Sequence, residues 1–270
     1  MTKQEQMIKL VKKRALAEQS IDSVLMYGSF TQGAGDKYSD IEFYVFVQDE
    51  GFACFDTSGW LSTIHPFYRN FLNEHLTQVV IFTNLIRGEF HFLPLSEISV
   101  IDSFTPAGYF PDIKAMNLCD KNGKLAKQLT ILKDCHVNRQ TKENAANIID
   151  NLLNYILFGV NVLKRGELAR ALECLGAAQK LYIQAVRLQE GSTDHWLNPS
   201  KNLEEEISPA CYETYKACTA VLTHESIFSA YTNLIKASEA SIRVMEKKYE
   251  VGDYSTLVEH ILSYHNNLCE

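Results

Sequence analysis

The sequence lacks a continuous apolar run of the roughly 18–20 residues that a membrane-spanning helix needs. Its longest apolar tract, around residues 155–162, has polar residues on either side. The chain begins with polar residues, and the apolar ones that follow are interrupted by Lys9, Lys12 and Lys13, which is not the pattern of a signal peptide. We therefore expect a soluble, cytoplasmic protein that has no membrane partner.

Basic residues are also in short supply. Lys and Arg number 26 against 33 Asp and Glu, giving a formal charge of -7. A long basic stripe that follows a phosphate backbone is disfavoured in such a chain, so no nucleic-acid partner is expected. The seven cysteines form no C-x-x-C motif, and their number is odd. Small buried side chains are therefore favoured over a zinc or redox site.

What the chain does contain is enough apolar material, 46% of 270 residues, to fill the core of one large domain or two small ones. Helical spacing predicts a helix over residues 3–19, and alternating or β-branched runs predict strands further along. The remaining elements expected before residue 138 are strands at 23–27, 41–47, 78–82 and 89–93, a helix at 60–73, and weaker strand candidates at 98–104 and 113–119.

After about residue 138 the pattern becomes helical. Thr141 is a plausible N-cap for a helix that runs to about Lys164, Gly166 interrupts, and a second helix follows over 167–189. Two or three more helices complete the chain. The fold class expected is α+β, with a mixed sheet and helices in residues 1–138 and a helical bundle in residues 139–270.

The segment that carries chemistry starts with Gly28-Ser29 at the end of a predicted strand, a tight turn whose backbone N–H groups and hydroxyl suit phosphate oxygens. A short loop later come Asp40 and Glu42, two residues apart in the next strand. Both carboxylates therefore point to the same face, while Ile41 points into the core. Two acids beside a phosphate-binding turn suit Mg²⁺, which takes one or two carboxylates together with phosphate oxygens.

An isolated D-x-E pattern is more often a solvated acidic strand, and only its position after the Gly-Ser turn favours a metal site. Glu89 lies in another strand-like segment and faces the same side as His91. Alone, Glu89 is compatible with a surface acid; beside a metal site it becomes a candidate general base. For His91 we favour a packing role.

Four segments together resemble the lincosamide nucleotidyltransferases, a group within the nucleotidyltransferase superfamily of DNA polymerase β-type folds. They are residues 26–31 (MYGSFT), 38–44 (YSDIEFY), 85–93 (LIRGEFHFL) and 161–167 (NVLKRGE). The similarity extends over essentially the full chain. It implies that residues 1–138 form a nucleotidyltransferase catalytic domain and that residues 139–270 form its C-terminal helical domain.

The resemblance implies transfer of AMP from ATP to a hydroxyl of lincomycin or clindamycin, with release of pyrophosphate and resistance to the antibiotic. Asp40 and Glu42 match the family's catalytic metal ligands for two Mg²⁺ ions, and Glu89 matches its base. Gly28 and Ser29 match the nucleotide-binding turn. The superfamily more often has Asp at the second carboxylate, whereas Glu42 agrees with the lincosamide group. Members are often homodimers.

Several alternatives stay open. Lys164 resembles a lysine that contacts the triphosphate in related enzymes, with Arg170 a weaker candidate, but Lys164 and Arg165 also suit the negative end of a helix dipole. The acceptor is alternatively an aminoglycoside or a protein hydroxyl. A non-catalytic nucleotide-binding module is disfavoured because all three carboxylates are present.

Overall fold

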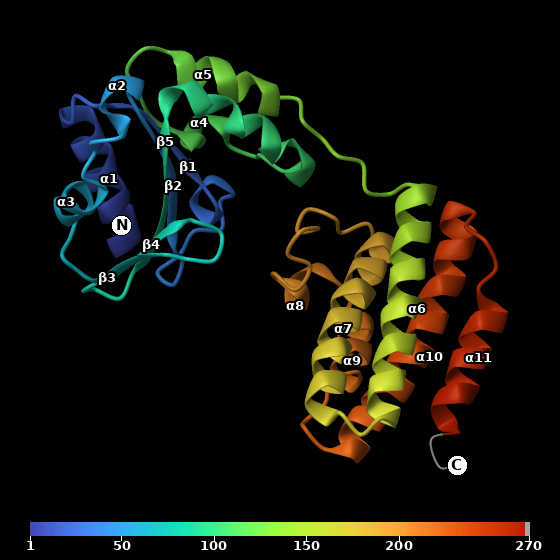
Figure 1. Ribbon diagram of the computed structural model, residues 1–270. Coiled ribbons are helices and arrows are strands. Elements are labelled where there is room, and N and C mark those ends of the chain that lie inside the picture. Colours follow the sequence, from blue (N-terminus) through green and yellow to red (C-terminus); the bar gives the residue numbers. More distant parts are fainter. Residues whose placement is uncertain (268–270) are drawn as a thin grey trace. The chain divides into compact units, whose positions relative to one another are not determined.

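The computed structural model describes residues 1–267 and consists of two compact units, Met1–Val137 and Asn138–Glu270. The boundary expected after residue 138 lies next to this division. The α+β fold class is confirmed, since a mixed six-stranded sheet with helices forms the first unit and helices alone form the second (Figure 1). Each unit is described below by itself.

The sheet of the N-terminal unit has the strand order β3-β4-β5-β2-β1-β6. Its central strands β2 and β5 run parallel to each other, whereas the other neighbouring pairs are antiparallel. The strands are β1 (Ile21–Tyr27), β2 (Ile41–Val47), β3 (Phe67–Leu72), β4 (Gln78–Phe82), β5 (Arg87–Pro94) and β6 (Asn117–Asp120).

Both faces of this sheet are covered, each by its own apolar core. Phe43 and Phe90 pack in one core with residues of α1 and α3, while Leu25 and Phe46 pack in the core on the opposite face. Because side chains alternate along a strand, the even-numbered residues of β2 share the second face. The covering elements are α1 (Lys3–Ala17), α2 (Asp49–Phe52) and α3 (Thr57–Ser62), then the 3₁₀ segments η1 (Ser29–Thr31), η2 (Leu95–Ala107) and η3 (Leu129–Leu132), with α4 (Ile113–Met116) and α5 (Lys124–Gln128).

The helix predicted over residues 60–73 is wrong. A short helix, α3, ends at Ser62, and the edge strand β3 follows from Phe67. Pro66 disfavours helical backbone at the residue before it, and the aromatic residues after it suit a pleated, half-exposed strand. Pairing with β4 then fixes the strand conformation that local spacing did not indicate.

The two weaker strand candidates are also corrected. Residues 98–104 lie within the 3₁₀ segment η2, in which the Ser103 hydroxyl donates to the Val100 carbonyl. Residues 113–119 are divided between a helix and a strand. Asp112 caps α4 by accepting from the Ala115 N–H at 2.9 Å, and the chain turns into β6 only at Asn117.

The C-terminal unit is a bundle in which α6, α7 and α10 run alongside one another around an apolar core (Figure 1). The predicted N-cap is confirmed, because the Thr141 hydroxyl accepts from the Asn144 N–H at 3.2 Å. The helices are α6 (Lys142–Lys164), α7 (Leu168–Glu190), α8 (Leu203–Glu206), α9 (Pro209–Ala217), α10 (His224–Tyr249) and α11 (Ser255–Asn266).

A fully buried arginine fixes the irregular segment after α7. The Arg187 guanidinium donates to the carbonyls of Ser192, Pro199 and Lys201, and Nη1 lies 2.6 Å from a carboxylate oxygen of Glu206. A buried charge is tolerated when it is paired and hydrogen-bonded in this way. The segment between α7 and α9 is thereby tied to the bundle.

Helix α6 is long and apolar enough to cross a membrane by length and composition. Half of its most apolar stretch is buried in the C-terminal unit, and the core helix of a soluble protein meets the same criteria. Cytoplasmic localisation therefore stays a prediction.

The cysteines agree in part with the expected packing role. Three of them are buried, Cys54 is exposed and two are intermediate, while Cys269 lies outside the described residues. The buried ones are Cys119, Cys174 and Cys218.

Candidate active site

The turn after β1 depends on a glycine. Gly28 has φ 79° and ψ -155°, a backbone conformation that residues with a side chain rarely adopt. A Cβ placed on Gly28 would also lie 1.6 Å from Oε2 of Glu42. The missing side chain therefore lets the Glu42 carboxylate lie directly over the turn that leads to Ser29.

The carboxylates predicted from the sequence lie together at one end of the sheet. In the parallel pair, Glu42 of β2 lies opposite Glu89 of β5, and on its other side Glu42 lies opposite Tyr27 of β1. Asp40 immediately precedes β2 and points to the same face as Glu42. Ile41 is buried on the opposite side, as expected. The structure thus brings Gly28, Asp40, Glu42 and Glu89 into one site.

A cation that the sequence reasoning missed stands between two of these acids. Arg87 Nη1 donates to Asp40 Oδ2 at 2.6 Å, and Nη2 donates to Glu89 Oε1. Partial burial opposes the charge of Arg87, but the hydrogen bonds to Asp40 and Glu89 outweigh it and raise the arginine pKa. The sequence contained one indication of this position. Arg87 precedes Glu89 by two residues in one strand, so the two side chains point to the same face of the sheet.

The Tyr27 hydroxyl contacts both the candidate base and His91. The Tyr27 hydroxyl donates to Glu89 Oε2 at 3.3 Å and lies 3.1 Å from His91 Nε2. A phenol has one proton, so while it is donated to Glu89 the proton between Tyr27 and His91 must belong to Nε2. Burial lowers the pKa of His91, which favours this neutral imidazole, and raises the pKa of Tyr27, which keeps it a donor.

His91 also has the packing role expected of it. Its ring stacks on that of Tyr44, with centroids 4.2 Å apart and an interplanar angle of 7°. Tyr44 and His91 are paired across β2 and β5, and each lies two residues after the acid of its own strand, Glu42 or Glu89. The stacked pair therefore supports the site and holds Nε2 against Tyr27.

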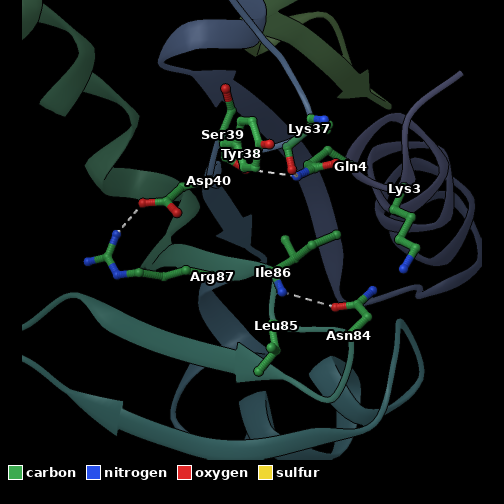
Figure 2. Close-up of a pocket in the computed structure, with 10 residues that line it drawn as sticks. All are labelled: Lys3, Gln4, Lys37, Tyr38, Ser39, Asp40, Asn84, Leu85, Ile86 and Arg87. Atoms are coloured by element: carbon green, nitrogen blue, oxygen red, sulfur yellow. Dashed lines mark hydrogen bonds and ion pairs between the residues drawn. The ribbon is translucent and has the colours of Figure 1, made fainter.

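A cavity of about 460 Å³ adjoins the acidic cluster (Figure 2). Asp40 and Arg87 form one wall, joined by their ion pair, and Lys3 lies on the far side. The buried Gln4 side chain ties the loop above the cavity to α1 by donating to the Lys37 and Ser39 carbonyls at 2.7 and 3.3 Å. The other lining residues are Tyr38, Asn84, Leu85 and Ile86.

Lys164 and Arg170 belong to the C-terminal unit. Lys164 Nζ donates to the Asn267 carbonyl at 3.2 Å and lies 4.3 Å from the centre of the Tyr264 ring. Arg170 pairs with Glu167 at 3.3 Å. Lys164 ends α6, where a cation suits the negative end of the helix dipole, whereas Arg170 lies in the first turn of α7. A role in nucleotide binding stays a prediction for both residues.

The donor set suits a hard divalent cation. Asp40 and Glu42 offer carboxylate oxygens on one face, and the Glu42 carboxylate lies over the Gly28 turn, so phosphate oxygens bound at that turn would be next to these ligands. Within residues 1–267 no group of three or more His, Cys, Asp or Glu side chains has the spacing of a metal cage. Mg²⁺ does not need one, because it commonly binds through one or two carboxylates plus substrate phosphates.

Solved structures similar to this chain include the following two. One is an aminoglycoside 6-adenyltransferase from Bacillus subtilis, with 16% identity, a TM-score of 0.45, and coverage of 99% of this chain and 98% of that one. The other is a nucleotidyltransferase-like protein from Exiguobacterium sibiricum 255-15, with 13% identity, a TM-score of 0.39, and coverage of 90% and 77%. At these scores neither similarity carries an argument about activity.

No match was found among curated proteins. A family model does match the C-terminal unit over residues 141–264, and it describes the C-terminal domain of lincosamide nucleotidyltransferase-like proteins. The resemblance drawn from the sequence is confirmed for this unit: residues 141–264 are similar to the C-terminal domain of lincosamide nucleotidyltransferase-like proteins.

Proposed function

We propose that this protein is a nucleotidyltransferase that transfers AMP from ATP to a hydroxyl of a lincosamide antibiotic and releases pyrophosphate. The observation that carries the proposal is the pairing of Glu42 with Glu89 next to Asp40, beside the Gly28 turn. The choice of lincosamide rests on the family of residues 141–264 together with the segment 85–93.

Each side chain has a distinct part in the proposed reaction. Asp40 and Glu42 would hold Mg²⁺, which when bound offsets charge on the phosphate oxygens. The backbone N–H groups of the turn at Gly28 and the Ser29 hydroxyl bind the phosphates that leave as pyrophosphate. Glu89 accepts the proton of the drug hydroxyl as its oxygen attacks the α-phosphorus.

The proton transfer to Glu89 is expected to contribute less to the rate than the positioning of the two substrates. General base catalysis supplies about 10²–10⁴ in rate, whereas alignment of the two substrates supplies up to roughly 7–11 kcal/mol of the barrier. The Tyr27 hydroxyl fixes the direction of the Glu89 carboxylate before the acceptor arrives. Positioning is therefore the larger contribution of the protein.

The decisive experiment is mass spectrometry of clindamycin after incubation with the purified protein, MgATP and pyrophosphatase. A product heavier by one adenylyl group, with fragments that locate the modified hydroxyl, is the expected result. Unmodified drug in the presence of folded, ATP-binding protein would contradict the lincosamide assignment. The same assay with an aminoglycoside or a protein substrate would then identify another acceptor.

Homodimer formation and cytoplasmic localisation belong to the same proposal. Light scattering coupled to size-exclusion chromatography tests the dimer by its mass. A mass equal to that of one 30.7 kDa chain at micromolar concentration would contradict it.

A further inference from the structure

The guanidinium of Arg87 lies where the acidic cluster needs a positive charge. It contacts Asp40 through Nη1 and Glu89 through Nη2, so it joins a proposed metal ligand to the proposed base. Asp40, Glu42 and Glu89 share one face at the start of two adjacent strands, and three carboxylates there repel one another unless a cation intervenes. Arg87 supplies that cation from the protein itself.

The pair is exposed enough to open at low cost. The Arg87 side chain is 42% exposed, Asp40 38% and Glu89 20%. Ion pairs in contact with solvent contribute little net free energy, because water and salt screen them. Arg187 is the contrasting case in the same chain, since it is fully buried and holds three backbone carbonyls as well as Glu206.

Arg87 also lines the cavity beside the site. Its side chain and that of Asp40 lie next to each other in the lining of this cavity of about 460 Å³ (Figure 2). Lys3 and Lys37 line the same cavity, so three cations and one acid, Asp40, border it. In a chain with a net charge of -7, this local balance favours an anion.

We propose that Arg87 exchanges partners when a nucleotide binds. In the free protein it neutralises Asp40 and Glu89; when a divalent cation arrives with a nucleoside triphosphate, it releases both carboxylates and donates to a phosphate oxygen. A planar guanidinium suits phosphate as well as carboxylate, because its parallel N–H groups match both. The identity of this ligand rests on the proposed function. Arg87 is thus a positioning residue for the acids and a binding residue for the nucleotide.

The first test measures binding of Mn²⁺ alone to the full chain, by electron paramagnetic resonance. If Arg87 competes for Asp40, Arg87→Ala should bind Mn²⁺ about threefold to tenfold more tightly than wild type. Arg87→Gln should behave in the same way, and Arg69→Ala, at an exposed arginine of β3, should leave the affinity unchanged. Unchanged or weaker Mn²⁺ binding by both folded Arg87 variants would overturn the competition.

The second test measures binding of α,β-methylene-ATP with Mg²⁺ by titration calorimetry. Here Arg87→Ala should bind about tenfold more weakly, because the phosphate loses a charge-assisted donor, and Arg87→Lys should recover part of that loss. A purely structural role would weaken metal and nucleotide binding together, so the opposite signs distinguish the exchange. Nucleotide binding that does not change in Arg87→Ala would overturn the phosphate contact.

Failure of the proposed function would look different. If clindamycin is not adenylylated while Arg87→Ala still shows tighter Mn²⁺ and weaker nucleotide binding, the acceptor assignment fails and the exchange stands. If wild type turns over clindamycin but both binding constants are the same in Arg87→Ala, the exchange fails and the function stands. Thermal unfolding of each variant confirms that the comparison is between folded proteins.

Discussion

Glu42 lies directly opposite Glu89 in the parallel register of β2 and β5, and the Tyr27 hydroxyl reaches Glu89 from the antiparallel neighbour β1. Three central strands therefore meet at one carboxylate. The Tyr27 contact, the Arg87 contact and the Glu42 neighbour each come from a different part of the chain, and together they define how Glu89 is oriented and charged.

Replacing the candidate base should separate chemistry from binding. In Glu89→Gln we expect turnover to fall by about 10²–10⁴, because the amide keeps the shape of the side chain but does not accept the proton. Nucleotide binding should be largely retained. Steady-state kinetics with clindamycin, together with calorimetry for the nucleotide, measure the two effects; unchanged turnover would remove Glu89 from the mechanism.

The Tyr27 hydroxyl should matter for rate more than for folding. Tyr27→Phe removes the donor to Glu89 and leaves the ring in place, so turnover should fall by about tenfold. Tyr44→Phe is the matched control, since it keeps the stacking on His91 and leaves the Tyr27–Glu89 hydrogen bond intact. Equal turnover in the two variants would show that Tyr27 does not position the base.

Two glycines with almost the same φ but different ψ, -155° at Gly28 and 3° at Gly123, test the turn over the acidic cluster. Gly28 has φ 79° and Gly123 has φ 78°, but a Cβ would meet Glu42 at the first and nothing within 4 Å at the second. Gly123→Ala should cost about 1–2 kcal/mol of unfolding free energy from left-handed backbone strain. Gly28→Ala should cost more, because the φ and ψ of Gly28 lie in a region that is essentially restricted to glycine. Gly28→Ala alone should also abolish turnover, because Glu42 is displaced. Similar turnover in both variants would contradict this role.

The buried Arg187 should be a major source of stability in the C-terminal unit. Arg187→Met removes the donor that three carbonyls share with Glu206, which keeps its contact with His195, and we expect a loss of about 3–5 kcal/mol in urea unfolding. Arg243→Met removes an exposed ion pair with Glu239 and should cost less than about 1 kcal/mol. Comparable losses would show that burial does not distinguish the two.

The stability of the same unit should fall in mild acid because of His265. Its pKa is lowered, chiefly by burial, and its Nδ1 has no hydrogen-bond partner among residues 1–267. Below the ordinary value of 6.5 the unfolded chain binds a proton that the folded chain does not, so unfolding free energy decreases as pH falls through this range.

One such proton changes the unfolding free energy by at most about 1.4 kcal/mol per pH unit. His265→Gln removes the titrating group, so its unfolding free energy should depend less steeply on pH between about 5 and 6.5 than that of wild type. Urea unfolding at several pH values measures the two slopes. The same slope in both proteins would assign the acid sensitivity to other groups.

Local patterns in the sequence were sufficient to predict part of the candidate active site. The Gly28-Ser29 turn follows β1, and the Asp40–Glu42 pair lies at the start of β2, the next strand. The two-residue spacing of the acids and the short loop before them indicated that they act together with the turn. Glu89 became a candidate base on chemical grounds and through family resemblance, because no local pattern relates it to Glu42. Its pairing with Glu42 depends on which distant strands become neighbours.

Arg87 was missed for the same reason. Its contact with Asp40 exists only because β2 and β5 pair in one particular register, and its own segment showed only that it shares a face with Glu89. The error at residues 60–73 is also non-local in origin. The pairing of β3 with β4 determined the conformation there, against the helical spacing of the apolar residues.

The parallel register has a consequence for which changes in chain length this protein tolerates. Between β2 and β5 the chain forms α2, α3 and the β3–β4 hairpin, so residues inserted in the hairpin turn at 73–77 leave the carboxylates where they are. Deletion of one residue within Arg87–Glu89 would instead move the side chains on one side of the deletion to the opposite face of the sheet. A phenylalanine would then take the place of an acid at the site. Natural or designed variants should therefore differ in length at the hairpin and keep the spacing from Arg87 to Glu89 constant.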